Sequence, residues 1–298
     1  MTHLGEWAAL GTAALWSGSY LAFTAAVRRI GADRVNRLRL LMAALVLALA
    51  HLVVYGVPLP TGAAAARWLW LSLSGVVGFT IADAFLFRAL YHLGAHRTSV
   101  VTALIPVTSA FLGWAVLGET LSPMQFVGVA ATVSSVVLIV TGQNSSRGEE
   151  GKRDAKLGVL FALGTVVAQS ARYLLSVKGM AGGFPVLSTN VVQILAATIA
   201  AWVLALPRGE WRGTLGALRD TKGARATAAG ALVGPVLGVT LSLVALGSSQ
   251  IGVASTLMAL TPVFLLPLTA LVFRERITWR SAIGTALAVA GVAVLWLC

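Results

Sequence analysis

Charged residues are scarce in this chain of 298 residues, where Asp, Glu, Lys and Arg together make up 11%. An average soluble domain carries about 25%. Hydrophobic residues make up 58% of the sequence, and its mean hydropathy is +0.87. A chain with so little charge cannot cover a water-facing surface. The composition therefore excludes a soluble globular protein and indicates an integral membrane protein.

Other absences narrow the function. Cys298 is the single cysteine, so an intramolecular disulfide is excluded. No basic region precedes the first apolar segment, and that segment is long enough to span a membrane, so we predict no cleavable signal peptide. The phosphate-binding patterns GxxxxGKS and GxxxxGKT are absent as well, which argues against ATP-driven transport within this chain.

Apolar segments of membrane length follow one another along almost the whole sequence. A bilayer core of about 30 Å is crossed by roughly 20 apolar residues in a helix. We predict ten spans and no soluble domain of useful size. The spans lie near 7–27, 36–55, 67–91, 97–117, 123–141, 156–178, 185–206, 222–247, 251–273 and 279–297.

The second half of the chain repeats the first. Residues 4–20 align with 157–173 at an offset of 153, and later segments align at an offset of 156. So long a period indicates a duplicated domain rather than a solenoid. We predict a first repeat at 1–141, a polar linker at 142–155 and a second repeat at 156–298. Identical pairs include Ser17/Ser170, Tyr20/Tyr173, Pro106/Pro262 and Glu119/Glu275.

Five spans in each repeat mean that the second repeat enters the membrane upside down relative to the first. The predicted fold class is an all-α membrane protein with ten transmembrane helices in two inverted five-helix repeats. Many secondary transporters are built this way, with a binding site between the repeats and alternating access to it.

Basic residues outnumber acidic ones by 22 to 10, which gives a net charge of +12. Eighteen Lys and Arg residues, with Arg37 and Arg39 counted among them, fall in loops after odd-numbered spans, and two fall on the opposite side. The positive-inside rule then places these loops in the cytoplasm and both termini outside, in the cell (inner) membrane. Short basic loops suit anionic lipid headgroups, whereas nucleic acid requires a basic face on a soluble domain.

The stretch from Ala89 to Val140 resembles the C-terminal part of an EamA-type domain. Its shared features are the approach ALYHLG, the proline of the fourth span and the Gly118-Glu119 turn before a glycine-bearing helix. The second repeat carries the same pattern at 242–295, with Arg274 in place of the glycine. The LWSGSY of the first span is similar to that family's aromatic-small-small start. The chain as a whole resembles a ten-helix member of the drug/metabolite transporter (DMT) superfamily.

Members of that superfamily typically export amino acids, other metabolites or drugs, or exchange phosphorylated compounds. The resemblance therefore implies a secondary active transporter of a small molecule, without enzymatic activity or a cofactor, and with protons as a possible coupling ion. Three alternatives stay open: a multidrug efflux pump, a translocator of lipid-linked substrates and, more remotely, an intramembrane enzyme. One chain already holds both repeats, so a monomer is sufficient, although a homo-oligomer stays possible.

Asp83 is the first candidate for a substrate- or proton-binding residue. It lies well inside the third predicted span, where an ionisable side chain is costly and usually functional. It could carry a coupling proton or bind a substrate amine, or it could form a structural ion pair. Arg88 is close in sequence, but five residues turn a helix by about 140°, so a direct pair between them is poor.

Arg172 is the second candidate, with Gln169 one turn before it and Tyr173 beside it. A guanidinium can hold a carboxylate or phosphate through two parallel hydrogen bonds. Reach towards the membrane surface is the alternative role for this arginine. In the first repeat Trp16 aligns with Gln169 and Ser19 aligns with Arg172, so this polar cluster belongs to the second repeat alone.

Four further side chains complete the predicted site. Tyr20 and Trp16 lie on the first span, and Tyr20 is the repeat equivalent of Tyr173. Asn190 and Gln193 lie one turn apart on the seventh span, where they could face a cavity or bond to neighbouring helices. We expect Ser17 and Ser170 to serve helix packing instead.

Two prolines are predicted to kink gating helices. Pro106 and Pro262 hold equivalent positions in the fourth and ninth spans, and proline removes a backbone donor and bends a helix. Glu119 and Glu275, at the turns that follow, are expected to stabilise helix N-termini. His92 and His96 have the i, i+4 spacing of a metal pair, but Gly94 separates them and no acid adjoins them, so we predict no metal site.

Overall fold

A computed structural model describes residues 4–117, 149–248, 251–273 and 279–297, and single residues at 123, 127, 130, 131 and 134. Within these ranges the chain is helical and contains no strand. Glu119, Glu275, residues 142–148 of the expected linker and nearly all of the expected span at 123–141 lie outside the described residues. The rest of that linker, from Glu149 on, belongs to a long helix.

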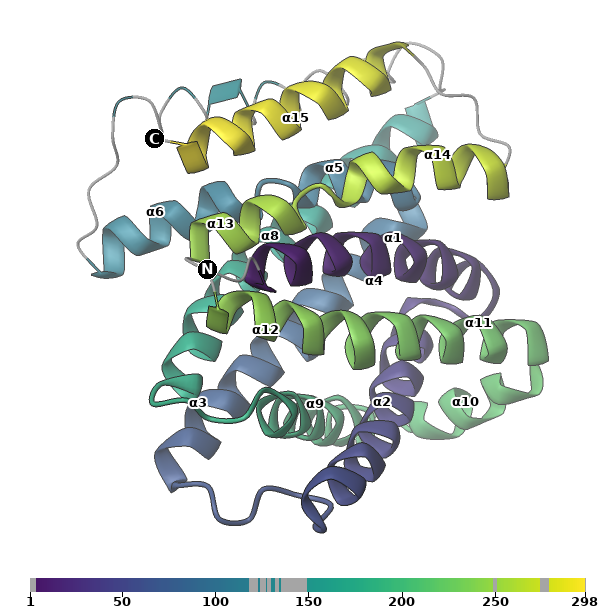
Figure 1. The fold of residues 1–298 in the computed structure, drawn as a ribbon. Helices are drawn as coiled ribbons and strands as arrows, with labels where there is room; N and C mark the ends of the chain where they lie inside the picture. The colour runs from purple at the N-terminus through teal and green to yellow at the C-terminus, as the bar shows by residue number, and fades with distance from the viewer. Residues whose placement is uncertain are drawn as a thin grey trace.

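The first repeat begins with two long helices joined by a one-residue turn, and its later spans are interrupted (Figure 1). Its elements are α1 (Leu4–Ile30), α2 (Ala32–Tyr55), α3 (Ala65–Gly75), the π-helix η1 (Val76–Ala82), α4 (Asp83–Leu93), α5 (Ala95–Thr102) and α6 (Ile105–Leu117).

The elements of the second repeat follow the same order, with two short elements, α10 and η2, inserted after its second long helix. They are α8 (Glu149–Met180), α9 (Val186–Val203), α10 (Glu210–Gly216), the 3-10 turn η2 (Ala217–Arg219), α11 (Thr221–Ala231), the π-helix η3 (Leu232–Gly238), α12 (Val239–Ser248), α13 (Ile251–Met258), α14 (Thr261–Phe273) and α15 (Trp279–Leu297).

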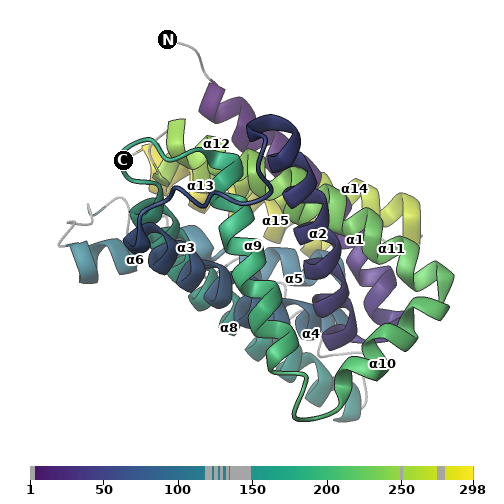
Figure 2. The ribbon, with the colours of Figure 1, turned by 90° about the horizontal axis from the view of Figure 1, so that it is seen from below.

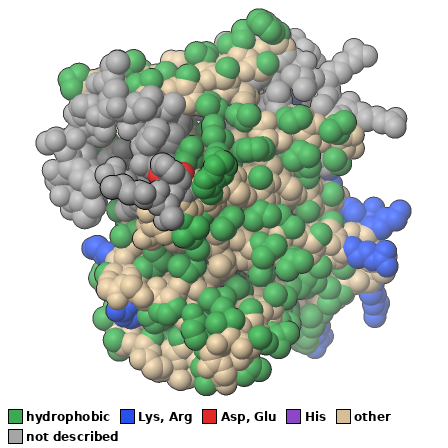
Figure 3. Space-filling model, viewed as in Figure 1, with side chains coloured by type: hydrophobic (Ala, Val, Ile, Leu, Met, Phe, Trp, Pro, Cys, Tyr) green, Lys and Arg blue, Asp and Glu red, His purple; other side chains and the backbone are tan. Residues whose placement is uncertain are grey.

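Five helical runs in the described residues are long and apolar enough to cross a membrane. They are Ala32–Tyr55, Ala65–Leu93, Asp154–Met180, Val186–Val203 and Thr221–Ser248. Their outer faces suit lipid: on α2, Leu45, Leu49 and Val53 recur one turn apart and are exposed by 65%, 62% and 78%. Figure 3 shows such apolar side chains over most of one flank, with Lys and Arg gathered at the end near α10 and α11.

The first helix of each repeat packs into the other repeat. Helix α1 lies against α11, α12 and α14, and its equivalent α8 lies against α3, α4 and α6. Helices α2 and α9, which are equivalent to each other, pack together directly, as the view in Figure 2 also shows. Reciprocal contacts of this kind are those of a two-fold relation, in which each partner uses the same surface.

The fourth and ninth spans are broken at equivalent places. Helix α5 ends at Thr102 and α6 begins at Ile105, while α13 ends at Met258 and α14 begins at Thr261. The two prolines explain this, because the nitrogen of Pro106 cannot donate to the carbonyl of Thr102 and its ring would clash with it. The expected kinks are present as two-residue turns, at 103–104 and 259–260, that interrupt the two spans.

Serine side chains fasten the two breaks to the opposite repeat. The hydroxyl of Ser17 donates to the carbonyl of Thr261, at 3.0 Å, and that of Ser170 donates to the carbonyl of Ile105, at 3.2 Å. Both acceptors directly precede a proline, and the two hydrogen bonds are repeat equivalents of each other. The serines serve packing between helices, as the sequence predicts.

The two π-helices also correspond, since 76–82 and 232–238 are separated by the repeat offset of 156. Each carries a glycine against which a side chain of the other repeat is pressed. A Cβ atom on Gly78 would lie 1.8 Å from Cδ of Arg172, and one on Gly234 would lie 2.5 Å from Oγ of Ser19. π-Helical turns inside longer helices are frequently found at functional sites.

Ion pairs join the two repeats at the end of the molecule that carries α10. Arg29 at the end of α1 pairs with Asp220 at 3.0 Å, and Arg37 at the start of α2 pairs with Glu210 at 2.5 Å. Hydrogen bonds from these arginines hold the pKa of each acid below its usual value. The stabilisation from these pairs is therefore present above the ordinary carboxyl pKa and is lost as the pH falls through the lowered values.

We expect Gly75→Ala to destabilise the fold, because a Cβ atom there would lie 2.1 Å from the backbone oxygen of Gln193 in α9. Helices α3 and α9 would have to separate, at a cost of about 1–3 kcal/mol that outweighs the gain in helix propensity. The matched control is Gly62→Ala, where nothing lies within 4 Å. Equal melting temperatures of the two purified variants in detergent would contradict this packing.

Candidate functional site

A cavity lies where α1, α2, α4, α8 and the two π-helices meet. Six of the eight predicted binding residues line it, from three separate parts of the chain. They are Trp16 and Tyr20 on α1, Asp83 at the start of α4, and Gln169, Arg172 and Tyr173 on α8. The apolar part of the wall includes Phe23, Phe79, Phe87 and Leu90.

Asp83 is held by an arginine that the sequence analysis assigned to a loop. Arg39 lies inside α2, is 2% exposed, and donates from Nη2 to Oδ2 of Asp83 at 2.5 Å. The same Nη2 reaches the carbonyl of Phe79 at 3.0 Å and Oδ1 of Asn36 at 2.9 Å. The guanidinium also lies over the ring of Phe87, with Cζ 5.0 Å from the ring centre.

The assignment of Arg39 to the cytoplasmic loop is therefore wrong. Its position inside the predicted span 36–55 already indicated a buried ion pair, because an arginine among apolar residues requires a partner. The acid within reach is on a different span, and sequence spacing cannot reveal such a contact. Arg88, by contrast, pairs with Asp33 at 2.8 Å, so the expected absence of a direct Asp83–Arg88 pair is confirmed.

Arg172 is fully buried and is oriented from three sides. Its Nε donates to Oε1 of Gln169 at 2.8 Å, and its Cζ lies 4.8 Å from the ring centres of both Phe79 and Tyr173. Gly78 leaves the room that its aliphatic part occupies. The terminal nitrogens Nη1 and Nη2 are buried and have no hydrogen-bond partner among the described residues.

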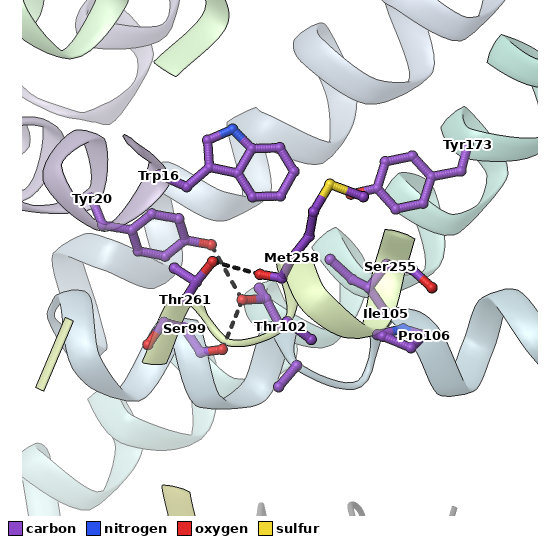
Figure 4. Close-up of a pocket in the computed structure, with 12 residues that line it drawn as sticks. Trp16, Tyr20, Ser99, Thr102, Ile105, Pro106, Tyr173, Ser255, Met258 and Thr261 are labelled. Atoms are coloured by element: carbon purple, nitrogen blue, oxygen red, sulfur yellow. Dashed lines mark hydrogen bonds between the residues drawn. The ribbon is translucent and has the colours of Figure 1, made fainter. Parts of the chain in front are cut away.

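A second cavity lies at the two helix breaks (Figure 4) and shares five lining residues with the first. Both are lined by Trp16, Tyr20, Thr102, Ile105 and Tyr173. Here the hydroxyl of Tyr20 is 3.2 Å from that of Thr102, which donates to the carbonyl of Ser99 at 3.0 Å. Hydroxyl groups come from both broken spans, with Ser99 and Thr102 on one and Ser255 and Thr261 on the other.

Of the two prolines, only Pro106 is among the described residues that line this second cavity. It directly follows Ile105. Pro262 follows Thr261, which also lines it, in the first turn of α14. The breaks that the prolines cause therefore bring the interrupted backbone of both repeats to one place.

Asn190 and Gln193 are buried but do not line either cavity. Nδ2 of Asn190 donates to the carbonyl of Pro235 at 2.9 Å, and Nε2 of Gln193 donates to Oγ of Ser176, also at 2.9 Å. In this structure both amides bond to neighbouring helices. Asn190 reaches the repeat equivalent of the carbonyl that Arg39 reaches in the first repeat.

The charges around the first cavity are unevenly divided between the repeats. The offset of 156 places Val239 opposite Asp83, and the offset of 153 places Ser19 opposite Arg172. The scaffold is thus duplicated, whereas the ionisable side chains are not. In the described part of the chain, no group of three or more His, Cys, Asp or Glu residues could hold a metal; Nδ1 of His92 lies 3.2 Å from Oδ1 of Asp154.

Comparisons with known proteins agree with this architecture. The model of the EamA-like transporter family matches residues 3–141 and 156–297. A solved structure described as "Crystal structure of protein" has a TM-score of 0.64 with this chain at 19% identity, covering 97% of this chain and 95% of that one. At this identity the likeness shows the fold alone. No curated protein matches the sequence.

We expect Asp83→Asn to destabilise the protein strongly, because it leaves the guanidinium of Arg39 charged and unpaired among apolar side chains. Removing one partner of a buried pair costs about 3–5 kcal/mol. The double variant Arg39→Gln/Asp83→Asn, with two neutral amides, should recover most of this loss. Thermal unfolding in detergent measures both.

The control for this experiment is Asp33→Asn, which breaks the exposed pair with Arg88 and should cost at most about 1 kcal/mol. If the double variant were as unstable as Asp83→Asn, or the control equally unstable, the buried pair would not be the cause.

Proposed function

Because the chain belongs to the EamA-like transporter family, we propose that it is a secondary active transporter that exports small metabolites such as amino acids. The chain is a multi-pass membrane protein of the DMT type. The observation that carries the proposal is the polar cavity at the contact between the repeats, lined by Asp83, Arg39 and Arg172 within otherwise apolar helices. Ionisable residues at such depth mark substrate or ion pathways.

Alternating access between two inverted repeats of five spans is the proposed mechanism. The reciprocal packing of α1 and α8 and the equivalent breaks before Pro106 and Pro262 support it. Discontinuous helices at a repeat interface are typical of transporter binding sites. Each break removes backbone hydrogen bonds that would otherwise stiffen the span, so each is a natural point for the half-helices to move relative to each other.

The orientation we propose has the α10 end in the cytoplasm and both chain termini outside. The start of α1 and the end of α15 lie towards the end of the molecule opposite α10, and the basic side chains gather at the α10 end (Figures 1 and 3). The ion pairs Arg29–Asp220 and Arg37–Glu210 join the repeats there. In this conformation they would close the cytoplasmic side of the cavity.

Asp83 is the proposed site of proton coupling. A proton on its carboxyl group would cancel the attraction to Arg39, and release of the proton would restore it. The ion pair lies beside the π-helix η1 and beside the cavity, so the protonation state of one side chain would influence both. Protonation of Asp83 would in this way act on the position of α2 relative to α4.

Export is tested by comparing metabolite pools in cells that lack the gene and in cells that overexpress it. We expect at least one small metabolite to accumulate inside the former and in the medium of the latter. The same compound is then followed in inverted membrane vesicles with and without an imposed pH gradient. Unchanged pools for all small metabolites would contradict the proposed export.

The double variant Arg39→Gln/Asp83→Asn is the control for coupling in these vesicles. It keeps a hydrogen-bonding pair but has no carboxyl group to titrate. We expect it to move the compound down its gradient with no response to pH, whereas the wild type responds. An equal response in both would exclude Asp83 as the coupling residue while leaving export untouched.

Alternating access also predicts that the repeats must part at the α10 end. In a Cys298→Ser background, a short thiol crosslinker across Arg37→Cys and Glu210→Cys should reduce export more than tenfold, because those positions join different repeats. The matched control is Asp33→Cys with Arg88→Cys, an exposed pair within the first repeat. Its crosslink should leave export within twofold of the uncrosslinked protein; equal effects of both crosslinks would contradict the mechanism.

A further inference from the structure

The two arginines of the first cavity differ in how many of their hydrogen-bond donors have a partner within the protein. Arg39 donates to a carboxylate, an amide oxygen and a backbone carbonyl. Arg172 donates from Nε to Gln169 and interacts with the side chain of Tyr173, and its two terminal nitrogens have no well-aligned hydrogen-bond partner among the described residues. A guanidinium stays charged in proteins and offers five donors. An unpaired one that is 0% exposed is therefore costly unless something else pairs with it.

The orientation of Arg172 suits a ligand with two oxygens. The contact of Nε with Gln169 fixes one edge of the guanidinium, and the rings of Phe79 and Tyr173 lie 4.8 Å from Cζ and restrict its plane. The Nη1–Nη2 edge is then the part that stays available. Such an edge binds a carboxylate or a phosphate oxyanion through two parallel hydrogen bonds, and prior orientation lowers the entropic cost of binding.

The charge balance of the cavity limits what the ligand can be. Among the described residues that line it, three are charged: Arg39, Asp83 and Arg172. Because Asp83 is already paired with Arg39, the cavity has an excess charge of +1, located on Arg172. One negative charge neutralises it. The described lining residues include no further acid for a cationic group, so a cation meets only the positive field of the arginine.

We propose that Arg172 binds a singly charged oxyanion, either the carboxylate of a small organic solute or the phosphodiester of a lipid headgroup. This inference rests on the proposed transport function, because the bound oxyanion would be the transported substrate or a lipid beside it. The binding itself can be measured without transport. The rest of the ligand extends past Trp16 and Tyr20 into the adjoining cavity, whose wall offers hydroxyl groups of Thr102 and Thr261. The site belongs to the second repeat, because Ser19 holds the equivalent place in the first.

The binding test uses the purified full-length protein in nanodiscs of phosphatidylcholine and two matched pairs of probes. Isobutyrate is compared with isobutyramide, and phenylacetate with phenylacetamide, so that each pair differs only in the charged oxygen. We expect at least one carboxylate to bind at least tenfold more tightly than its amide, measured by the rise in melting temperature with concentration. Phenethylamine, of the same size but cationic, should bind no better than the amide.

Three variants assign the preference to Arg172. Arg172→Gln should remove the difference between acid and amide, and Arg172→Lys, with one donor group in place of a fork, should retain only part of it. Arg88→Gln removes an arginine outside the cavity and should keep the wild-type preference. If Arg172→Gln does not fold, the comparison of Arg172→Lys with the wild type decides the matter.

A lipid arm separates the two sources of oxyanion. Nanodiscs with phosphatidylglycerol replace those with phosphatidylcholine, and the melting temperatures of wild type and Arg172→Gln are compared in both. Stabilisation by phosphatidylglycerol that needs Arg172, without a preference for either carboxylate, assigns the site to a lipid phosphodiester. No preference for any of these anions, or a preference that persists in Arg172→Gln, overturns the proposal.

The outcome is independent of export. Binding that depends on Arg172 in a protein that exports nothing would refute the transport proposal and leave the oxyanion site intact. Export with no dependence of anion binding on Arg172 would do the reverse.

Discussion

A polar group inside a membrane must find its hydrogen-bond or charge partner within the protein, because lipid offers none. Most of the architecture follows from this constraint. Ser17 and Ser170 donate to backbone carbonyls beside the broken spans of the opposite repeat. Arg39 is surrounded by acceptors from α2, η1 and α4. The serine hydrogen bonds join the two repeats, and the contacts of Arg39 join helices within the first repeat. The hydrogen bonds that these polar groups require therefore also hold the helices together.

The helical scaffold is duplicated between the repeats, whereas the ionisable side chains of the cavity are not. Reciprocal helix packing, paired π-helices and paired breaks repeat at the same offsets, as expected of two copies of one ancestral unit. The ionisable residues do not repeat. Where Arg39 contacts the backbone of η1, Asn190 contacts that of η3 with a neutral amide. A symmetric frame thus encloses a cavity whose charged side chains are not symmetric.

Much of this was accessible from sequence because the signals were local. The length of the apolar runs predicted helices where helices lie, and the equivalence of Pro106 and Pro262 predicted two interruptions at matching places. Asp83 and Arg172 were each singled out because ionisable side chains inside predicted spans are rare, and both line the same cavity. The role of Arg39 was missed because its partner is 44 residues away on another span. A loop count based on charge treats every arginine as solvated and cannot detect such a pair.

The membrane setting, the duplication, the family and the positions of the two helix interruptions could all be predicted from the amino-acid sequence, since each depends on composition, periodicity or a single proline. Which polar side chains meet, by contrast, depends on the tertiary structure. It turned Asn190 and Gln193 towards neighbouring helices, joined Arg39 to Asp83, and left the terminal nitrogens of Arg172 without a partner among the described residues. The reason is physical: helical rotation and packing, which no linear pattern records, determine whether a polar atom faces another helix or a cavity.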